Sequence, residues 1–172
     1  MILRRGRAAL RARRLADARL RRCRDIASSL ELPVPFDAAE LVETVARRRG
    51  RPIELMPIDW TPGVPCGLLI AAEQADYIVY TADTPLLHRQ HILVHELAHL
   101  LCEHDGALSD ELLPHLPALL IGRVLGRTVY AQPQEEEAEL LASLILQRSA
   151  WPAPSQRADP FLAPAPGAGG RG

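Results

Sequence analysis

The sequence contains no lysine, so arginine supplies all 20 of its basic side chains. Aromatic residues make up only 4% of the chain, and Leu, Ile, Val and Ala must therefore fill the core. The apolar fraction of 48% is typical of a globular protein and excludes an intrinsically disordered one. At 172 residues, the chain has the length of one domain with a substantial core.

Cysteine is also scarce, and Cys23, Cys66 and Cys102 are too few and too scattered for a disulfide framework. The simpler interpretation is a protein of a reducing compartment, and we expect a cytoplasmic location. Residues 1–5 begin like a signal peptide, but no apolar stretch of about 7–15 residues follows, which argues against secretion. No run approaches the length of about 20 apolar residues that a membrane-spanning helix needs.

Positive charge is concentrated at one end of the chain. Residues 1–52 contain 14 arginines and 6 acidic residues, whereas residues 53–172 contain 6 arginines and 15 acidic residues. The basic segment could bind nucleic acid or an acidic partner. The competing interpretation, which we favour, is a solvated arginine-rich helix that pairs with the acidic remainder of the chain.

Composition divides the chain into three parts. Residues 1–32 are an arginine-rich segment, most of which is predicted to be one helix that runs over 5–30. Residues 33–150 carry the strand and helix signals of the main domain. Residues 151–172 are rich in Pro, Ala and Gly, and we expect a disordered tail.

The main domain opens with a helix that three strands follow. Asp37 is expected to cap the helix, Glu40 to complete a capping box, and Gly50 to end the helix. Short strands are predicted at 52–58, 68–72 and 77–80. The last two strands are expected to form a hairpin around residues 73–76. These elements predict an α+β domain with a short, mostly antiparallel sheet packed on helices.

Further helices follow the strands. Pro85 marks the first turn of a helix that Asp83 or Thr84 would cap and that runs to about Glu103. A final helix is predicted at 133–149, and residues 117–126 could form another.

The helix predicted after Pro85 contains the pattern His-Glu-Leu-Ala-His at residues 95–99. Each helical residue turns by about 100°, so two histidines four residues apart project from one face. Two imidazoles placed in this way can bind one zinc ion. Glu96 lies about 100° further round the helix, where it can act as general base toward metal-activated water without binding the metal. The pattern therefore predicts zinc-dependent hydrolysis of a peptide bond.

A third ligand must come from elsewhere. The metzincin pattern requires Gly and His where this chain has Cys102 and Asp105, so that class is excluded. His104 is predicted to face away from His95 on the helix. Cys102 shares a face with both motif histidines and could be a ligand, but a cysteine in such a place is more often a small core residue.

The final helix offers a better third ligand. On a helical wheel, its apolar side chains define one buried face: Ala138, Leu141, Ala142, Ile145 and Leu146. Glu135 lies nearest this face and Glu139 next, whereas Glu136 and Glu137 are predicted to point to solvent. We therefore predict that Glu135 binds the metal with the two motif histidines, and that Glu139 accepts the outer N–H of one of them. A helix N-terminus that favours negative charge would explain the acidic cluster without a metal.

Three other features could contribute to a site. His91 could lie near the mouth of the cleft, although both it and His88 are more simply polar positions at the start of the helix. Tyr130 could donate a hydrogen bond to an oxyanion, although a core or surface tyrosine is the commoner case. The strand at 77–80 could be an edge strand that pairs with an extended peptide.

The pattern His95-Glu-Leu-Ala-His-Leu-Leu, followed by Glu135-x-Glu-Ala-x-x-Leu-Ala, resembles the ImmA/IrrE metallopeptidases over residues 35–148. Members of that family carry an H-E-x-x-H helix and a later E-x-E-A-[N/D]-x-F-A helix. This chain has Glu139 where Asn or Asp is usual and Leu141 where Phe is usual.

The resemblance implies a zincin-like domain with a central motif helix and one zinc ion, whose third ligand is the glutamate that Glu135 matches. It also implies a site-specific endopeptidase that cleaves a protein, often a cognate transcriptional repressor. Some relatives are labelled as toxin components of toxin–antitoxin pairs. No helix-turn-helix pattern is evident in the sequence, so we expect a DNA-binding partner to be a separate chain.

Two other functions stay open from the sequence. The chain could be a non-catalytic regulatory or toxin–antitoxin-type protein in which zinc is a structural staple. It could also be an arginine-rich nucleic-acid-binding module, although we do not expect direct binding to nucleic acid.

Overall fold

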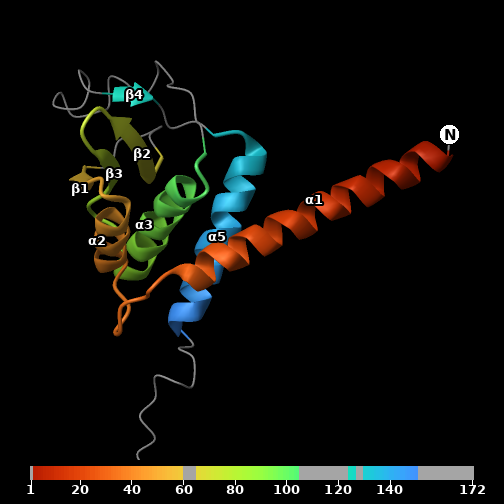
Figure 1. The fold of residues 1–172 in the computed structure, drawn as a ribbon. Coiled ribbons are helices and arrows are strands. Elements are labelled where there is room, and N and C mark those ends of the chain that lie inside the picture. The colour runs from red at the N-terminus through yellow and green to blue at the C-terminus, as the bar shows by residue number, and fades with distance from the viewer. Residues whose placement is uncertain (1, 60–64, 105–123, 127–129, 151–172) are drawn as a thin grey trace, which may run out of the picture.

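The structure is a computed structural model that describes residues 2–59, 65–104, 124–126 and 130–150, and it shows a small α+β domain (Figure 1). In chain order its elements are α1 (Ile2–Ser29), α2 (Ala38–Arg49), β1 (Ile53–Ile58), β2 (Gly67–Ala72), β3 (Asp76–Thr81), α3 (Leu86–Leu101), β4 (Val124–Gly126) and α5 (Gln132–Ala150). The α+β class predicted from the sequence is therefore confirmed. The tail predicted at 151–172 lies outside the described residues.

The sheet is mixed and has the strand order β1-β3-β2-β4. Strands β1 and β3 are parallel, whereas β2 is antiparallel to both β3 and β4. The predicted hairpin of β2 and β3 is confirmed, and its turn is closed by the Ala72 N–H, which donates to the Ala75 carbonyl oxygen at 3.0 Å. The helix considered at 117–126 lies mostly outside the described residues, but residues 124–126 pair with β2 as a strand, so no helix extends over them.

Strand β3 lies inside the sheet, because β1 pairs with one of its edges and β2 with the other. The possibility that residues 77–80 form an edge strand is therefore excluded. The physical reason is visible in two neighbouring side chains. Ile78 and Val79 point to opposite faces of the sheet and are both fully buried, as is typical of an interior strand.

Helix α2 begins at the Asp37 cap and ends at Gly50, as its sequence predicts. The Asp37 side chain accepts hydrogen bonds from the backbone N–H groups of Ala39 and Glu40 at 2.7 and 3.1 Å. Gly50 ends the helix at φ 65°, in the left-handed region that glycine enters without steric cost, and its N–H reaches the Arg47 carbonyl oxygen. The buried face of α2 packs against α3 and β1.

Helix α3 lies between the sheet and α5 and also contacts α2 (Figure 1). Most of its circumference is buried, because neighbours cover it on several sides. Pro85 itself is the N-cap, and the Thr84 hydroxyl donates to the Thr81 carbonyl oxygen at 2.8 Å. The predicted cap by Asp83 or Thr84 is therefore wrong. The helix ends at Leu101, two residues earlier than predicted.

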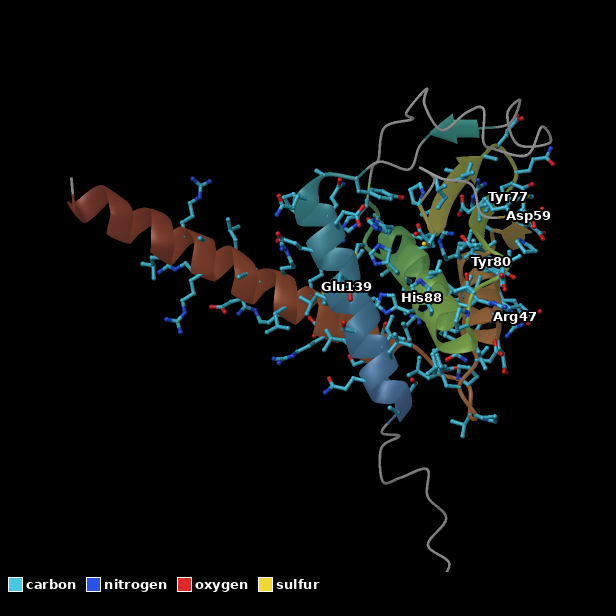
Figure 2. All side chains as sticks on the ribbon, turned by 180° about the vertical axis from the view of Figure 1, so that it is seen from behind. Arg47, Asp59, Tyr77, Tyr80, His88 and Glu139 are labelled. Atoms are coloured by element: carbon cyan, nitrogen blue, oxygen red, sulfur yellow. The ribbon has the colours of Figure 1, made fainter. Side chains whose placement is uncertain are left out.

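Helix α1 packs against α5 through its C-terminal part, and its N-terminal part extends away from the domain (Figures 1 and 2). Cys23 and Ala27 are buried against the main core, whereas Leu10 and Leu15 are exposed. Among the described residues, no helix is both long and apolar enough to cross a lipid bilayer.

Two arginines of α1 pair with glutamates of α5. Arg19 Nη1 lies 2.9 Å from Glu136 Oε2, and Arg22 Nη1 lies 3.4 Å from Glu137 Oε1. The basic N-terminal helix thus pairs with the acidic part of the chain where the two meet, as the favoured interpretation of its charge predicts.

Candidate metal centre

Three side chains converge between α3 and α5, two from the motif on α3 and one from the first turn of α5. The Nε2 atoms of His95 and His99 are 3.2 Å apart. Glu135 Oε2 lies 3.3 Å from His95 Nε2 and 3.6 Å from His99 Nε2. The structure therefore brings together all three residues that the sequence predicts as metal ligands.

The spacing of these three atoms fits one small divalent cation. Zinc binds nitrogen and oxygen ligands at about 2.0–2.2 Å, and in a tetrahedron such ligands lie about 3.4 Å from one another. The observed separations of 3.2, 3.3 and 3.6 Å are close to that value. The three atoms form one face of a tetrahedron, and two imidazoles with one carboxylate are a ligand set that zinc accepts.

The cluster opens onto a pocket of about 300 Å³. His99 is almost fully buried at 1% exposure of its side chain, whereas the Glu135 side chain is 47% exposed. The pocket is also lined by Glu96 and, from β2 and the segment before it, by Cys66 and Gly67. A cation at the cluster would therefore keep one side open to the pocket.

Glu96 lies on the pocket wall and is only 7% exposed. Burial, and after it the negative charge of Glu135, raise the pKa of its carboxyl group to about 8 against the opposing effect of a backbone hydrogen bond from Leu69. A divalent cation held by the cluster would offset both causes and favour the ionised carboxylate. A general base needs that ionised form.

His99 carries no charge at neutral pH. Burial, and after it the neighbouring His95 and His104, lower the pKa of its imidazole to about 3. A neutral imidazole is the form that binds a metal, so the surroundings of His99 favour the ligating state.

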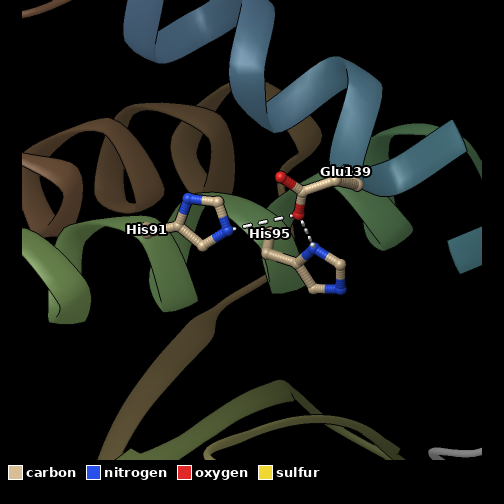
Figure 3. A group of neighbouring side chains, drawn as sticks. All are labelled: His91, His95 and Glu139. Carbon is tan, nitrogen blue, oxygen red and sulfur yellow. Dashed lines mark hydrogen bonds and ion pairs between the residues drawn. The ribbon is translucent and has the colours of Figure 1, made fainter. Parts of the chain in front are cut away.

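Glu139 extends from α5 between two rings of α3 (Figure 3). Its Oε2 lies 3.4 Å from His95 Nδ1 and 3.2 Å from His91 Nε2. His95 Nδ1 is the nitrogen that faces away from the cluster, so Glu139 lies where the sequence predicts an acceptor for the outer N–H of a ligand. His91 lines the pocket, in agreement with a position at the cleft mouth.

His104 and Glu137 lie beside the cluster, although the sequence analysis predicts that both point elsewhere. His104 Nδ1 is 3.0 Å from His99 Nδ1, and His104 Nε2 is 3.4 Å from Glu137 Oε2. The two side chains are 5% and 15% exposed, so the prediction that Glu137 faces solvent is wrong.

The error at His104 comes from the end of the helix. The prediction for His104 assumes that the helical rotation of α3 continues to residue 104. Glu103 instead has φ 56° and turns the chain back, so that the His104 N–H donates to the His99 carbonyl oxygen. The Asp105-Gly106 dipeptide, a common turn signal, was the clue that the helix ends early.

Tyr130 and Cys102 complete the surroundings of His99. The Tyr130 ring stacks on the His99 ring, with centroids 3.6 Å apart and planes at 16°, and it lines the pocket. Cys102 is buried in the main core, which agrees with its interpretation as a small core residue. Burial, and after it the charge of Glu137, raise the pKa of the Cys102 thiol to about 12, so the thiol is protonated.

Gly67 is required where β2 passes α3 beside the site. A Cβ atom at this position would lie 2.5 Å from Ile92 Cγ2 and 2.7 Å from Glu96 Oε1. Gly67→Ala is therefore expected to displace Glu96 and to lower the free energy of unfolding by about 1–3 kcal/mol, measured by denaturant titration. Ala71→Ser, at an exposed position of the same strand, is the control and should shift stability by less than about 0.5 kcal/mol. Equal midpoints for Gly67→Ala and the unmodified chain would show that β2 has room to move.

The chain matches no family model, no curated protein and no solved structure. The interpretation of the site therefore depends on the residues and distances given above.

Proposed function

We propose that this chain is a zinc-dependent endopeptidase with a zincin-like domain, in which α3 is the central motif helix. The observation that carries the proposal is the convergence of His95, His99 and Glu135 at the spacing of tetrahedral zinc ligands. The buried carboxyl group of Glu96 on the wall of the same pocket is the second element that hydrolysis requires. The resemblance of both helices to the ImmA/IrrE metallopeptidases supports this reading.

The openness of the site favours catalysis over a structural role for the metal. Structural zinc sites are closed by four protein ligands, whereas catalytic sites use three and keep a position for water or substrate. Here three ligand atoms face a pocket, and Glu96 is not needed for metal binding. The pairing of Arg19 and Arg22 with α5 gives no support to the nucleic-acid alternative.

In the proposed reaction, His95, His99 and Glu135 hold the zinc ion. When bound, the ion would act as a Lewis acid that activates water and polarises the peptide carbonyl. Glu96 accepts the proton of the attacking water and then donates it to the amine of the leaving peptide. Glu139 orients the His95 ring through its outer nitrogen, and Tyr130 restrains the His99 ring by stacking on it.

We propose that the substrate is a protein, namely a cognate transcriptional repressor or another regulator supplied as a separate chain. This substrate class follows from the resemblance. The three cysteines are free thiols, which supports the proposal of a reducing, cytoplasmic compartment.

The proposal is tested on the full chain with zinc and a proteome-derived peptide library. We expect one zinc ion per chain by elemental analysis, and new peptide termini by mass spectrometry that vanish after chelation and return with zinc. A chain that cannot be loaded with zinc would refute the metal centre. One bound zinc ion without any cleavage would favour the regulatory protein with a structural ion.

A further inference from the structure

A row of polar contacts leads from His99 away from the pocket. His99 Nδ1 lies 3.0 Å from His104 Nδ1, and the other nitrogen of His104 lies 3.4 Å from Glu137 Oε2. The second oxygen of Glu137 lies 3.4 Å from Arg22 Nη1, and Arg22 Nη2 donates to the Cys102 carbonyl oxygen at 2.7 Å. The row thus joins α3, the turn after it, α5 and α1.

Packing holds the middle of this row in place. The side chains of His104 and Glu137 are largely buried, and the His104 ring meets the His99 ring edge-on at 5.1 Å between centroids. His104 stands behind His99, because it contacts Nδ1 whereas Nε2 faces His95 and Glu135. Interactions in such a buried place are screened less by water than those on the surface.

The chemistry of the groups sets the direction of these hydrogen bonds. The carboxylate of Glu137, paired with Arg22, can only accept, so His104 must donate to it from Nε2. In its neutral form His104 has one N–H, so with Nε2 as the donor its Nδ1 is an acceptor. His99 must therefore donate from Nδ1, which leaves the lone pair of its Nε2 directed at His95 and Glu135.

We propose that His104 is a positioning residue, which Glu137 and Arg22 support, and that it holds His99 in the Nδ1–H tautomer with Nε2 ready to bind a cation. The consequence for zinc rests on the proposed function, whereas the tautomer is a property of the metal-free chain. Without His104, the proton of His99 is free to occupy Nε2, where it blocks the ligating lone pair. The arginine-rich helix α1 thereby supports the metal centre through Arg22.

A second cation offers a competing use of the same groups. One ligand atom each of Cys102, His104 and Glu137 lies within 4.8 Å of the others. The Arg22 guanidinium, however, contacts both the Glu137 carboxylate and the Cys102 carbonyl, and so supplies the positive charge there. We therefore expect one zinc ion per chain.

The direct test is nitrogen NMR of the histidine rings in the metal-free chain near pH 7.5, with His99 assigned by its loss in His99→Asn. We expect a protonated Nδ1 and a bare Nε2 on His99. His104→Phe should convert a large share of His99 to the Nε2–H tautomer. His104→Gln should restore the original tautomer, because its amide oxygen can accept the same hydrogen bond. His88→Phe, an exposed position at the start of α3, is the control and should change nothing.

Zinc affinity, measured by competition with a chelator, is the second readout. His104→Phe should weaken zinc binding by about 10–100-fold, and His104→Gln should recover most of the loss. Glu137→Leu leaves both rings in place and should shift the tautomer and the affinity in the same direction, so it carries the test if His104→Phe does not fold.

Three results would overturn the proposal. The first is an Nε2–H tautomer of His99 in the unmodified metal-free chain, and the second is a His99 tautomer that neither His104→Phe nor Glu137→Leu changes. The third is a second zinc ion that is lost in His104→Phe. A chain that shows the expected tautomers but binds no zinc would refute the proposed function and leave the positioning role intact.

Discussion

Glu96→Gln is expected to abolish peptide cleavage and to leave zinc binding unchanged. Glutamine has the shape of glutamate but cannot accept the proton of the attacking water, and a general base contributes about 10²–10⁴-fold to a rate. The side chains placed closely enough to bind one cation are His95, His99 and Glu135. Glu96 is not among them, so the variant should retain the ion. The rate is measured on a peptide from the library screen, and zinc content by elemental analysis of the same sample.

Glu54→Gln, an exposed position on β1 away from the pocket, controls for the loss of one negative charge. Its rate and zinc content should match those of the unmodified chain. Loss of zinc in Glu96→Gln would place this carboxylate among the ligands. Full activity in that variant would remove Glu96 from the mechanism and leave another group to act as base.

Glu135→Ala is expected to weaken zinc binding by at least about 100-fold. Removal of a partner that only orients a ligand costs about 10–100-fold in metal affinity, and removal of a ligand should exceed that. Because the Glu135 side chain is 47% exposed, its loss should change the stability of the metal-free chain by less than about 0.5 kcal/mol. The substitution should therefore lower zinc affinity without lowering stability. Chelator competition measures the affinity, and a denaturant titration of the metal-free chain measures the stability.

Glu136→Ala is the matched control, since this exposed glutamate is adjacent in sequence and pairs with Arg19 away from the cluster. It should bind zinc as the unmodified chain does. If Glu135→Ala also retains full affinity, the third ligand is another residue. One ligand atom each of His91, His95 and Glu139 also lies within 4.8 Å of the others, so Glu139 would be the next residue to substitute.

Local patterns in the sequence were enough to predict several parts of the fold and the site. The cap at Asp37, the stop at Gly50 and the hairpin of β2 and β3 depend on residues close together in the chain, where steric and hydrogen-bonding rules act directly. The same holds for the shared face of His95 and His99, because the turn of a helix sets it.

The wheel of α5 predicted most of the buried apolar stripe of the helix, and Glu135 and Glu139 do lie beside the histidines of α3. It missed that Glu137, at 15% exposure, is more buried than either of these glutamates. That Glu135 meets the histidines could be inferred only by pairing two motifs, since periodicity within one helix says nothing about its neighbour. The distances among the three ligand atoms came from the structure alone.

By itself, the sequence determined the helical motif, the cap and the stop of α2, and the apolar stripe of α5, since each depends on a few neighbouring residues. Only the tertiary structure decided that β3 is an interior strand and that His104 and Glu137 stand behind His99. The first depends on pairing with both neighbouring strands, and the second on the turn at Glu103 and the packing of α1 on α5. Contacts between distant segments are selected by the packing of the whole core, so no local pattern in the chain specifies them.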